Sequence, residues 1–386
     1  MLYENYHSPW LDEELRMLQD AAGKFFTREF LPLNEQWIKQ GKVDRDAWNK
    51  AGEAGLLCTD VPVAYGGGGG DYRHETVVME EMLGVGINGF GNQVHSTIVA
   101  PYILRYGNEE QKQCWLPKMA TGELVGAIAM TEPNTGSDLQ SVRTTALRDG
   151  DDYVINGSKT YITNGQLADL VIVVAKTDPD LGAKGISLIV VETADNPGFE
   201  RGRNLKKLGQ KSADTSELFF ADCRVPLANR LGDDEGTGFV QLMQQLPQER
   251  LSIAQAAVVQ AEHAIEITLE FVKERKAFGQ RVLDFQNTRF KLAECKTEAF
   301  IGRTFVDQCL VRHLNKELDA ATASMAKYWC TQKQCEIIDE CLQLHGGAGY
   351  MDEYEISRMY ADARVQKIYG GTNEIMKELI GRSLDW

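Results

Sequence analysis

Two adjacent glycines near the C-terminus lie between stretches that otherwise favour helix. The segment reads Ile-Tyr-Gly-Gly-Thr-Asn-Glu over residues 368–374, with the pair at Gly370 and Gly371. A glycine inside a helix costs about 1 kcal/mol relative to alanine, because it has more backbone freedom to lose on folding. The pair therefore indicates a non-helical backbone here, or a close approach of the main chain to another group.

Two further segments carry groups that could hold a ligand. Residues 129–138 read Ala-Met-Thr-Glu-Pro-Asn-Thr-Gly-Ser-Asp, a strand end that runs into a loop of backbone donors and hydroxyls. Such a loop can hold a pyrophosphate or the edge of an aromatic ring, but the same composition is common in ordinary turns. Further along, Tyr161 and Thr163 are two apart and so share one face of a strand. An ordinary amphipathic strand end also explains that spacing.

One acidic residue stands in a helical pattern next to a proline. Glu249 belongs to Leu-Pro-Gln-Glu-Arg-Leu over residues 246–251, and Pro247 should kink or restart the helix there. That would place Glu249 on a distorted turn with Arg250 beside it. On these residues alone, the commoner interpretation is an exposed acid near a helix start.

The elements that must position these residues change character twice along the chain. Apolar residues recur at helical spacing from about residue 11 to 122, short β-rich runs occupy about 125–230, and helical spacing then returns. We therefore predict an α+β protein of three domains. These are an N-terminal helical domain (1–124), a central antiparallel β-sheet or β-barrel domain (125–235) and a C-terminal helical bundle (236–386).

Turn and strand signals subdivide these domains. Tight hairpins are predicted at Asp149-Gly150-Asp151 and at Asn156-Gly157. We expect strands near 124–130, 153–155, 170–175, 186–191 and 217–220, and long helices near 250–274, 288–314 and 319–344.

Composition excludes several classes of protein. The 386 residues hold 41 basic and 56 acidic side chains, a formal net charge of −15, which disfavours a binder of the nucleic-acid backbone. No apolar run approaches the roughly 20 residues that span a bilayer, and the first ten residues do not resemble a secretory signal. The eight cysteines show no zinc-ligand spacing. We expect a cytoplasmic protein with reduced thiols, no metal, no membrane insertion and no nucleic-acid partner.

Five motifs in one order resemble the acyl-CoA dehydrogenase family, and most closely its long-chain type. They are Met-Thr-Glu-Pro with Gly-Ser-Asp (130–133, 136–138), Tyr-Ile-Thr-Asn-Gly (161–165), Arg-Lys-Ala-Phe-Gly (275–279), Gln-Leu-His-Gly-Gly-Ala-Gly-Tyr (343–350) and the segment 368–374. Each motif alone is weak, but their order across a helix–β–helix layout makes coincidence improbable. The resemblance implies an FAD-dependent oxidoreductase of fatty acid β-oxidation that forms a homotetramer. It also implies an acyl-CoA substrate and an electron-transferring flavoprotein as electron acceptor.

The resemblance implies where FAD would be bound. Residues of the central domain would line the flavin and its phosphates: Ile128, Ala129, Met130, Thr131, Gly136, Ser137, Tyr161, Ile162 and Thr163. A neighbouring subunit would contact the adenine and pyrophosphate end through Arg275, Phe278, Gln286, Gln343, Leu344, His345, Gly346 and Gly347. Thr372, Asn373 and Glu374 would return to FAD. Position 161 is often tryptophan in the family, and tyrosine keeps a flat ring there. A structural histidine that closes a helix also explains His345.

The implied reaction removes an α-proton from an acyl-CoA thioester while the β-hydrogen leaves as hydride to flavin N5. Many members carry the glutamate base at the position of Gly370, which has no side chain here. The long-chain and isovaleryl branches place it in the helix that holds Glu249, so Glu249 is the predicted base and trans-2-enoyl-CoA the product. Arg250 and Ser137 would contact the CoA portion. The backbone of Gly370 and Gly371 would bind the thioester oxygen.

Two alternatives keep this fold. An acyl-CoA oxidase would let dioxygen reoxidise the flavin, although those relatives are usually considerably longer. A non-catalytic relative that binds FAD and nucleic acid would have lost its base, and both the negative charge and Glu249 argue against it. The acyl group also stays open, since straight long chains, branched chains and terpenoid-derived acids all need the same flavin and base.

Overall fold

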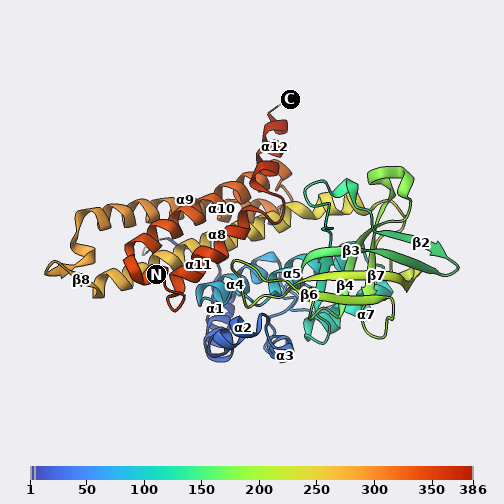
Figure 1. The fold of residues 1–386 in the computed structure, drawn as a ribbon, viewed down its shortest axis with the longest axis horizontal. Helices are drawn as coiled ribbons and strands as arrows, with labels where there is room; N and C mark the ends of the chain where they lie inside the picture. Colours follow the sequence, from blue (N-terminus) through green and yellow to red (C-terminus); the bar gives the residue numbers. More distant parts are fainter. Residues whose placement is uncertain (1, 4–5, 385–386) are drawn as a thin grey trace.

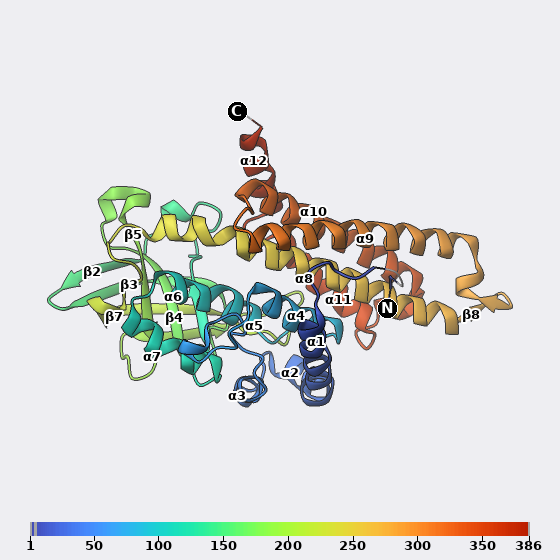
Figure 2. The same cartoon turned by 180° about the vertical axis from the view of Figure 1, so that it is seen from behind.

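The computed structural model describes residues 2–3 and 6–384 and has helices at both ends of the chain with a β-sheet between them (Figure 1). The long C-terminal helices lie along one side, the N-terminal helices lie beneath them, and the sheet forms one end of the molecule (Figures 1 and 2). This arrangement confirms the predicted α+β class with helical, β and helical parts in that order.

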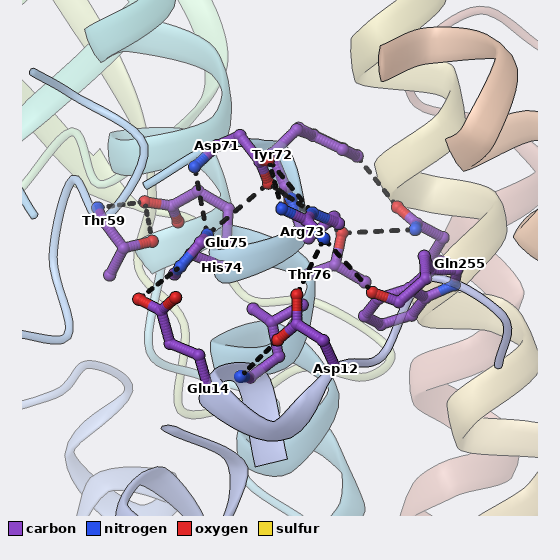
Figure 3. A network of polar contacts seen from close by, with 12 residues as sticks. Asp12, Glu14, Thr59, Asp71, Tyr72, Arg73, His74, Glu75, Thr76 and Gln255 are labelled. Atoms are coloured by element: carbon purple, nitrogen blue, oxygen red, sulfur yellow. Dashed lines mark hydrogen bonds and ion pairs between the residues drawn. The ribbon is translucent and has the colours of Figure 1, made fainter. Parts of the chain in front are cut away.

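The N-terminal helices pack against the long helix α8 (Gly238–Glu274). Tyr72 on α4 donates its hydroxyl to Oε1 of Gln255 on α8 (2.9 Å), and Nε2 of Gln255 donates to Oγ1 of Thr76 (3.3 Å; Figure 3). These bonds fix α8 against the N-terminal part. The elements are α1 (Glu13–Phe25), α2 (Asn34–Gln40), α3 (Arg45–Glu53), α4 (Tyr72–Gly84), α5 (Asn92–Val94), the π-helical turn η4 (His95–Val99), α6 (Ala100–Tyr106) and α7 (Glu109–Ala120).

The central sheet is mixed, which corrects the prediction of a purely antiparallel one. Strand β1 pairs with β4 in parallel along its whole length, and β2 meets β4 in parallel at the pair Thr145 and Lys176. All other pairs in this sheet are antiparallel, in the order β1-β4-β2-β3-β7-β6 with β5 on β4. The parallel pair became possible because a long connection carries the chain from β1 to β4. The bounds are β1 (Gly126–Ala129), β2 (Thr145–Asp149), β3 (Asp152–Thr163), β4 (Leu170–Lys176), β5 (Ile186–Glu192), β6 (Phe199–Asn204) and β7 (Thr215–Pro226).

One of the two predicted hairpins is present. Strands β2 and β3 join through Gly150, whose φ of 63° suits a tight turn. The hairpin predicted at Asn156-Gly157 is wrong, because both residues lie inside β3 at a register shift against β7. A Cβ on Gly157 would lie 2.5 Å from Oγ1 of Thr144, so this glycine serves a close approach within the sheet rather than a turn.

The C-terminal helices form the predicted bundle, and α8 connects it to both other parts. Leu251 on α8 packs in one buried cluster with Leu15 and Val77, and Leu242 packs in another with Leu188 of the sheet. Since these cores are shared, the domain limits 1–124, 125–235 and 236–386 stay a prediction. The remaining elements are β8 (Lys276–Ala277), β9 (Gln280–Arg281), α9 (Gln286–Leu314), α10 (Ala320–Leu344), α11 (Glu355–Ala363) and α12 (Asn373–Ser383).

Candidate active site

Glu249 lies in α8 with its side chain turned into the protein. It is only 5 % exposed, so the interpretation of an exposed acid is wrong. Its Oε1 accepts a hydrogen bond from the hydroxyl of Tyr102 on α6 (2.9 Å). A carboxylate that is removed from water and bonded to a buried phenol is typical of a functional acid or base.

The restart of the helix predicted at Pro247 is also wrong, because α8 continues through it. Contacts on both sides of the proline hold the helix in place. Nε2 of Gln248 donates to the carbonyl oxygen of Thr97 (3.0 Å), and Oε1 of Gln245 accepts from Arg105 (3.0 Å). Tertiary contacts thus compensate for the backbone hydrogen bond that a proline cannot make.

The environment of Glu249 changes its acidity. Burial raises the pKa of its carboxyl from 4.5 to about 7, and the Tyr102 hydrogen bond and the Arg250 charge act in the opposite direction. A carboxylate with this pKa is an effective proton acceptor near neutral pH, because it is partly ionised there and binds a proton strongly.

The double-glycine loop has the non-helical backbone that its sequence predicts. Gly370 has a φ of 65° and Gly371 a φ of 92°. A Cβ on Gly370 would lie 2.4 Å from Cδ1 of Ile253, and one on Gly371 would lie 2.8 Å from Cε of Met376. Ile253 follows Glu249 by one helical turn on α8, so the loop lies against the part of α8 that carries the acid.

Two basic side chains hold the carbonyl groups of this loop. Nε of Arg250 lies 3.5 Å from the carbonyl oxygen of Gly370, and Nζ of Lys327 on α10 donates to that of Gly371 (2.7 Å) and to Oδ1 of Asn373 (3.0 Å). Each of the two carbonyl oxygens therefore accepts a hydrogen bond from a side chain of the protein. These contacts resist rotation of the two peptide groups, so the N–H directions of Gly371 and Thr372, which share those peptide planes, are set as well.

Lys327 is not among the site residues predicted from the sequence, although the sequence holds a signal for it. The buried face of α10 includes Ala323, Ala326, Lys327, Cys330 and Thr331, at the spacing of one helix face. A lysine is almost never fully buried without a specific partner, and this one is 0 % exposed. Burial lowers its pKa from 10.5 to about 7, with the Arg250 charge acting in the same direction.

The residues after the glycines begin a helix. Oγ1 of Thr372 accepts from the backbone N–H of Ile375 (3.3 Å) and caps α12, and Asn373 is buried against Thr331 on α10. Glu374, the rival carboxylate, is exposed in the first turn of α12. Its solvation makes it a weaker base than Glu249.

The two segments of the central domain predicted to bind the cofactor lie side by side. The backbone N–H of Thr160 donates to the carbonyl oxygen of Thr131 (2.9 Å). Tyr161 has a φ of 61° and is 68 % exposed, so its ring stands out from the sheet next to the end of β1. Gly136 and Ser137 are exposed on the loop, Ala129 and Ile162 are buried, and Ile128, Met130, Thr131 and Thr163 are partly buried.

A buried ion pair supports this region, and sequence reasoning missed it. Nζ of Lys159 lies 2.9 Å from Oε1 of Glu132 and also donates to the carbonyl oxygens of Met130 (3.1 Å) and Val174 (2.7 Å). Burial lowers the pKa of Lys159 from 10.5 to about 8, against the raising effect of Glu132. Glu132 also accepts from Thr144, so the pair ties the loop at 130–138 to β3, to β4 and to the residue that precedes β2.

The residues predicted to reach the cofactor from a neighbouring subunit lie at the end of the folded molecule opposite the sheet (Figures 1 and 2). Arg275 follows α8, Phe278 is 97 % exposed in the turn between β8 and β9, and Gln286 begins α9. Residues 343–347 end α10. One chain therefore does not bring these residues to the loops around Thr131 and Tyr161.

His345 closes α10 as a structural residue would. Its Nδ1 lies 2.9 Å from the carbonyl oxygen of Cys341, and its ring stacks on Phe271 with centroids 4.3 Å apart. It is followed by Gly346 with a φ of 58°. This is the histidine before a glycine terminator that the sequence predicts.

The fold and the site together define a class of protein. A buried carboxylate lies one helical turn from the place where Ile253 meets the double-glycine loop, and the central sheet carries the exposed aromatic ring of Tyr161. A carboxylate in such a setting can accept a proton. Three family models cover nearly the whole chain: acyl-CoA dehydrogenase N-terminal domain (12–123), middle domain (127–223) and C-terminal domain (236–384). The chain belongs to the acyl-CoA dehydrogenase family, whose members are FAD-dependent oxidoreductases acting on CH–CH bonds.

Individual relatives agree with this assignment. The mitochondrial long-chain specific acyl-CoA dehydrogenase of Sus scrofa is 51 % identical over 95 % of this chain and 86 % of its own. The crystal structure of an acyl-CoA dehydrogenase from Geobacillus kaustophilus matches with a TM-score of 0.96 and 50 % identity, over 98 % of this chain and all of that one. A glutaryl-CoA dehydrogenase from Mycobacterium smegmatis in complex with FADH2 matches with a TM-score of 0.90 and 30 % identity, over 97 % and 95 %.

In the described residues 2–3 and 6–384, no helix has a stretch long and apolar enough to cross a bilayer. The cytoplasmic location stays a prediction, because the name of the Sus scrofa relative places that protein in the mitochondrion.

Proposed function

We propose that this chain binds FAD and catalyses the α,β-dehydrogenation of an acyl-CoA thioester to the trans-2-enoyl-CoA, with Glu249 as the base. The observation that carries the proposal is the buried Glu249 carboxyl, whose pKa is raised to about 7 and which lies one turn from the contact between Ile253 and Gly370. A base of this kind on α8 offsets the lack of a side chain at Gly370.

The central domain offers groups that fit FAD. The exposed ring of Tyr161 can lie against a flat isoalloxazine, and the exposed loop at Gly136 and Ser137 presents backbone donors suited to phosphate oxygens. Thr131 and Thr163 add hydroxyls beside them. When bound, FAD would supply the acceptor for the hydride that leaves the β-carbon.

The chain's own residues account for the removal of the proton. The Glu249 carboxylate takes the α-proton, and the backbone N–H of Gly370 donates to the thioester oxygen, where negative charge develops. Arg250 and Lys327 hold the carbonyl groups of Gly370 and Gly371, which limits the movement of the loop that carries this N–H before substrate arrives. Such preorganised donors are worth about 2.7–4 kcal/mol of barrier in acyl-transfer enzymes.

We further propose long-chain acyl-CoA as the substrate, an electron-transferring flavoprotein as electron acceptor and a homotetramer as the assembly. The 51 % identity to a long-chain specific relative supports the first of these. Phe278 is 97 % exposed and lies at the end of the molecule opposite the sheet that carries Tyr161. This exposed ring supports a contact with a neighbouring subunit that would complete the cofactor site. The CoA contacts assigned to Ser137 and Arg250 belong to the same proposal.

The test of the base is a single-turnover experiment. Glu249→Gln should bind FAD and acyl-CoA yet fail to bleach the flavin when the two are mixed without oxygen. Glu378→Gln is the matched control, because that carboxylate is exposed on α12 and pairs with Arg382, and it should bleach the flavin at close to the wild-type rate. Bleaching by Glu249→Gln at the wild-type rate would reject Glu249 as the base.

Substrate and acceptor need separate measurements. Turnover of short, medium, long and branched acyl-CoA thioesters with an artificial electron acceptor tests the preference for long chains. Purified protein that is colourless and takes up no FAD would contradict the cofactor assignment. Formation of peroxide without an added acceptor would favour an oxidase over a dehydrogenase.

A further inference from the structure

We propose that Tyr102 is a positioning residue for the base: its hydroxyl holds the carboxylate of Glu249 in the orientation, and in the ionised form, that proton removal requires. This inference rests on the proposed role of Glu249 and extends it to a residue of a different helix. Tyr102 precedes Glu249 by 147 positions, so only the fold brings the two together.

The contact is direct and is removed from water. Tyr102 is 0 % exposed and Glu249 is 5 % exposed, and the phenol oxygen lies 2.9 Å from Oε1. In the part of the chain that the structure describes, no other side chain is recorded as a hydrogen-bond donor to this carboxylate. The ring of Tyr102 is packed among buried apolar residues that include Val99 and Ile103, so its hydroxyl has little freedom to turn elsewhere.

Side-chain contacts set the place of α6 against α8. Arg105 donates to Oε1 of Gln245 (3.0 Å), and Tyr106 donates to Oε1 of Gln244 (2.9 Å). Gln248 also donates to the turn η4, so residues both before and after Tyr102 in the chain bond to α8. The position of the phenol is therefore set by the packing of α6 on α8 and not only by its hydrogen bond to Glu249.

The charged side chains near Glu249 are directed to other groups, so their role differs from that of Tyr102. Arg250 on the same helix lowers the pKa of Glu249 as well, but its side chain is directed to the Gly370 carbonyl. Lys327 on α10 is directed to the Gly371 carbonyl, and Arg105 on α6 is directed to Gln245. Glu374 on α12 is exposed.

A donor on the carboxylate favours its ionised form, because the hydrogen bond to a charged acceptor is stronger than that to a protonated acid. The same bond points Oε1 along one direction and leaves the other oxygen to face the substrate. Loss of the phenol hydroxyl should therefore raise the pH at which the base becomes active. The rate at high pH, where the base is fully ionised, should change little.

The test is the pH dependence of flavin reduction by acyl-CoA in the absence of oxygen, measured with the FAD-loaded enzyme. In Tyr102→Phe, the midpoint of the rate–pH curve should move up by about one pH unit, with about tenfold slower reduction near pH 6 and close to wild-type reduction near pH 9. Tyr106→Phe is the matched control, since it removes a hydroxyl one turn further along α6 that bonds to Gln244. Its midpoint should stay at the wild-type value.

An unchanged midpoint in Tyr102→Phe, with the rate lowered equally at all pH values, would overturn the proposal and leave Tyr102 a packing residue. If Tyr102→Phe does not fold, replacing Tyr102 by 3,5-difluorotyrosine keeps the ring and makes the hydroxyl a stronger donor, so the midpoint should move down; no movement would again overturn the proposal. Glu249→Gln separates the two hypotheses. Rapid bleaching by that variant refutes the base itself, whereas no bleaching together with an unmoved Tyr102→Phe midpoint refutes only the role of Tyr102.

Discussion

The ammonium of Lys327 lies 2.7 Å from the carbonyl oxygen of Gly371, at a point where the lysine side chain is fully buried. A buried amine is costly unless its donors are used, and here the acceptors are the glycine loop and Asn373. The contact therefore ties the loop that follows α11 to the middle of α10. It gives the double glycine a fixed backbone without a side chain of its own.

We predict that Lys327→Met weakens catalysis more than it weakens the fold. The methionine fills the same volume, but the Gly371 carbonyl and Asn373 lose their donor, at a cost of about 1–3 kcal/mol. With the loop less ordered, KM for acyl-CoA should rise and the rate of flavin reduction should fall. Lys333→Met on the same helix removes a lysine that pairs with Glu298 and Glu336 near the surface, and should leave both kinetic constants nearly unchanged.

Gly370→Ala should lower the rate of flavin reduction by acyl-CoA. The φ of 65° costs a residue with a side chain about 1–2 kcal/mol, and the new Cβ would meet Cδ1 of Ile253 at 2.4 Å. Gly381→Ala in α12 is the control, because outside its own helix and its chain neighbours no described atom lies within 4 Å of its added Cβ. It should raise thermal stability slightly through helix propensity. Equal kinetics for the two variants would show that the geometry at Gly370 is not required.

Glu249→Gln should be more stable than the wild type at alkaline pH, although it is predicted to be inactive. The folded-state pKa of about 7 lies above the ordinary 4.5, so the folded protein holds a proton that the unfolded chain releases between these values. This contribution to stability is complete below about pH 4.5 and is lost as the pH rises through 7. We expect Glu249→Gln to gain on the order of 1–3 kcal/mol at about pH 8 and nothing at about pH 4. Denaturant unfolding at both pH values measures this, and a gain that does not depend on pH would contradict it.

Glu132→Gln should destabilise the central domain and weaken FAD binding together. It leaves the fully buried Lys159 without its counter-charge, and breaking a buried pair by removing one partner costs about 3–5 kcal/mol. The double variant Glu132→Gln with Lys159→Met removes the uncompensated charge and should recover part of the melting temperature. FAD content and thermal unfolding of the three proteins give the comparison. A single variant as stable as the wild type would show that the pair does not support this loop.

The local features of this protein can be predicted from its sequence. Positive φ at Gly370 and Gly371, the turn at Gly150 and the long periodic helices follow from properties of single residues and their spacing, which act within a few positions of the chain. The prediction at Asn156-Gly157 was wrong because the same dipeptide also suits a bulge, and only the pairing with β7 distinguishes the two.

Which of these features come into contact depends on the packing of elements that are distant in the chain. Glu249 is bonded to Tyr102, which is 147 positions away, and Lys327 contacts Gly371, which is 44 positions away. The burial of Glu249 likewise depends on distant parts of the chain. No local pattern encodes such separations, since they depend on how α6, α8 and α10 pack. The parallel pairing of β1 with β4 and the continuation of α8 through Pro247 have the same origin. Local sequence patterns can indicate the candidate residues. Helix packing is what buries Glu249, one of many acidic residues, and raises its pKa.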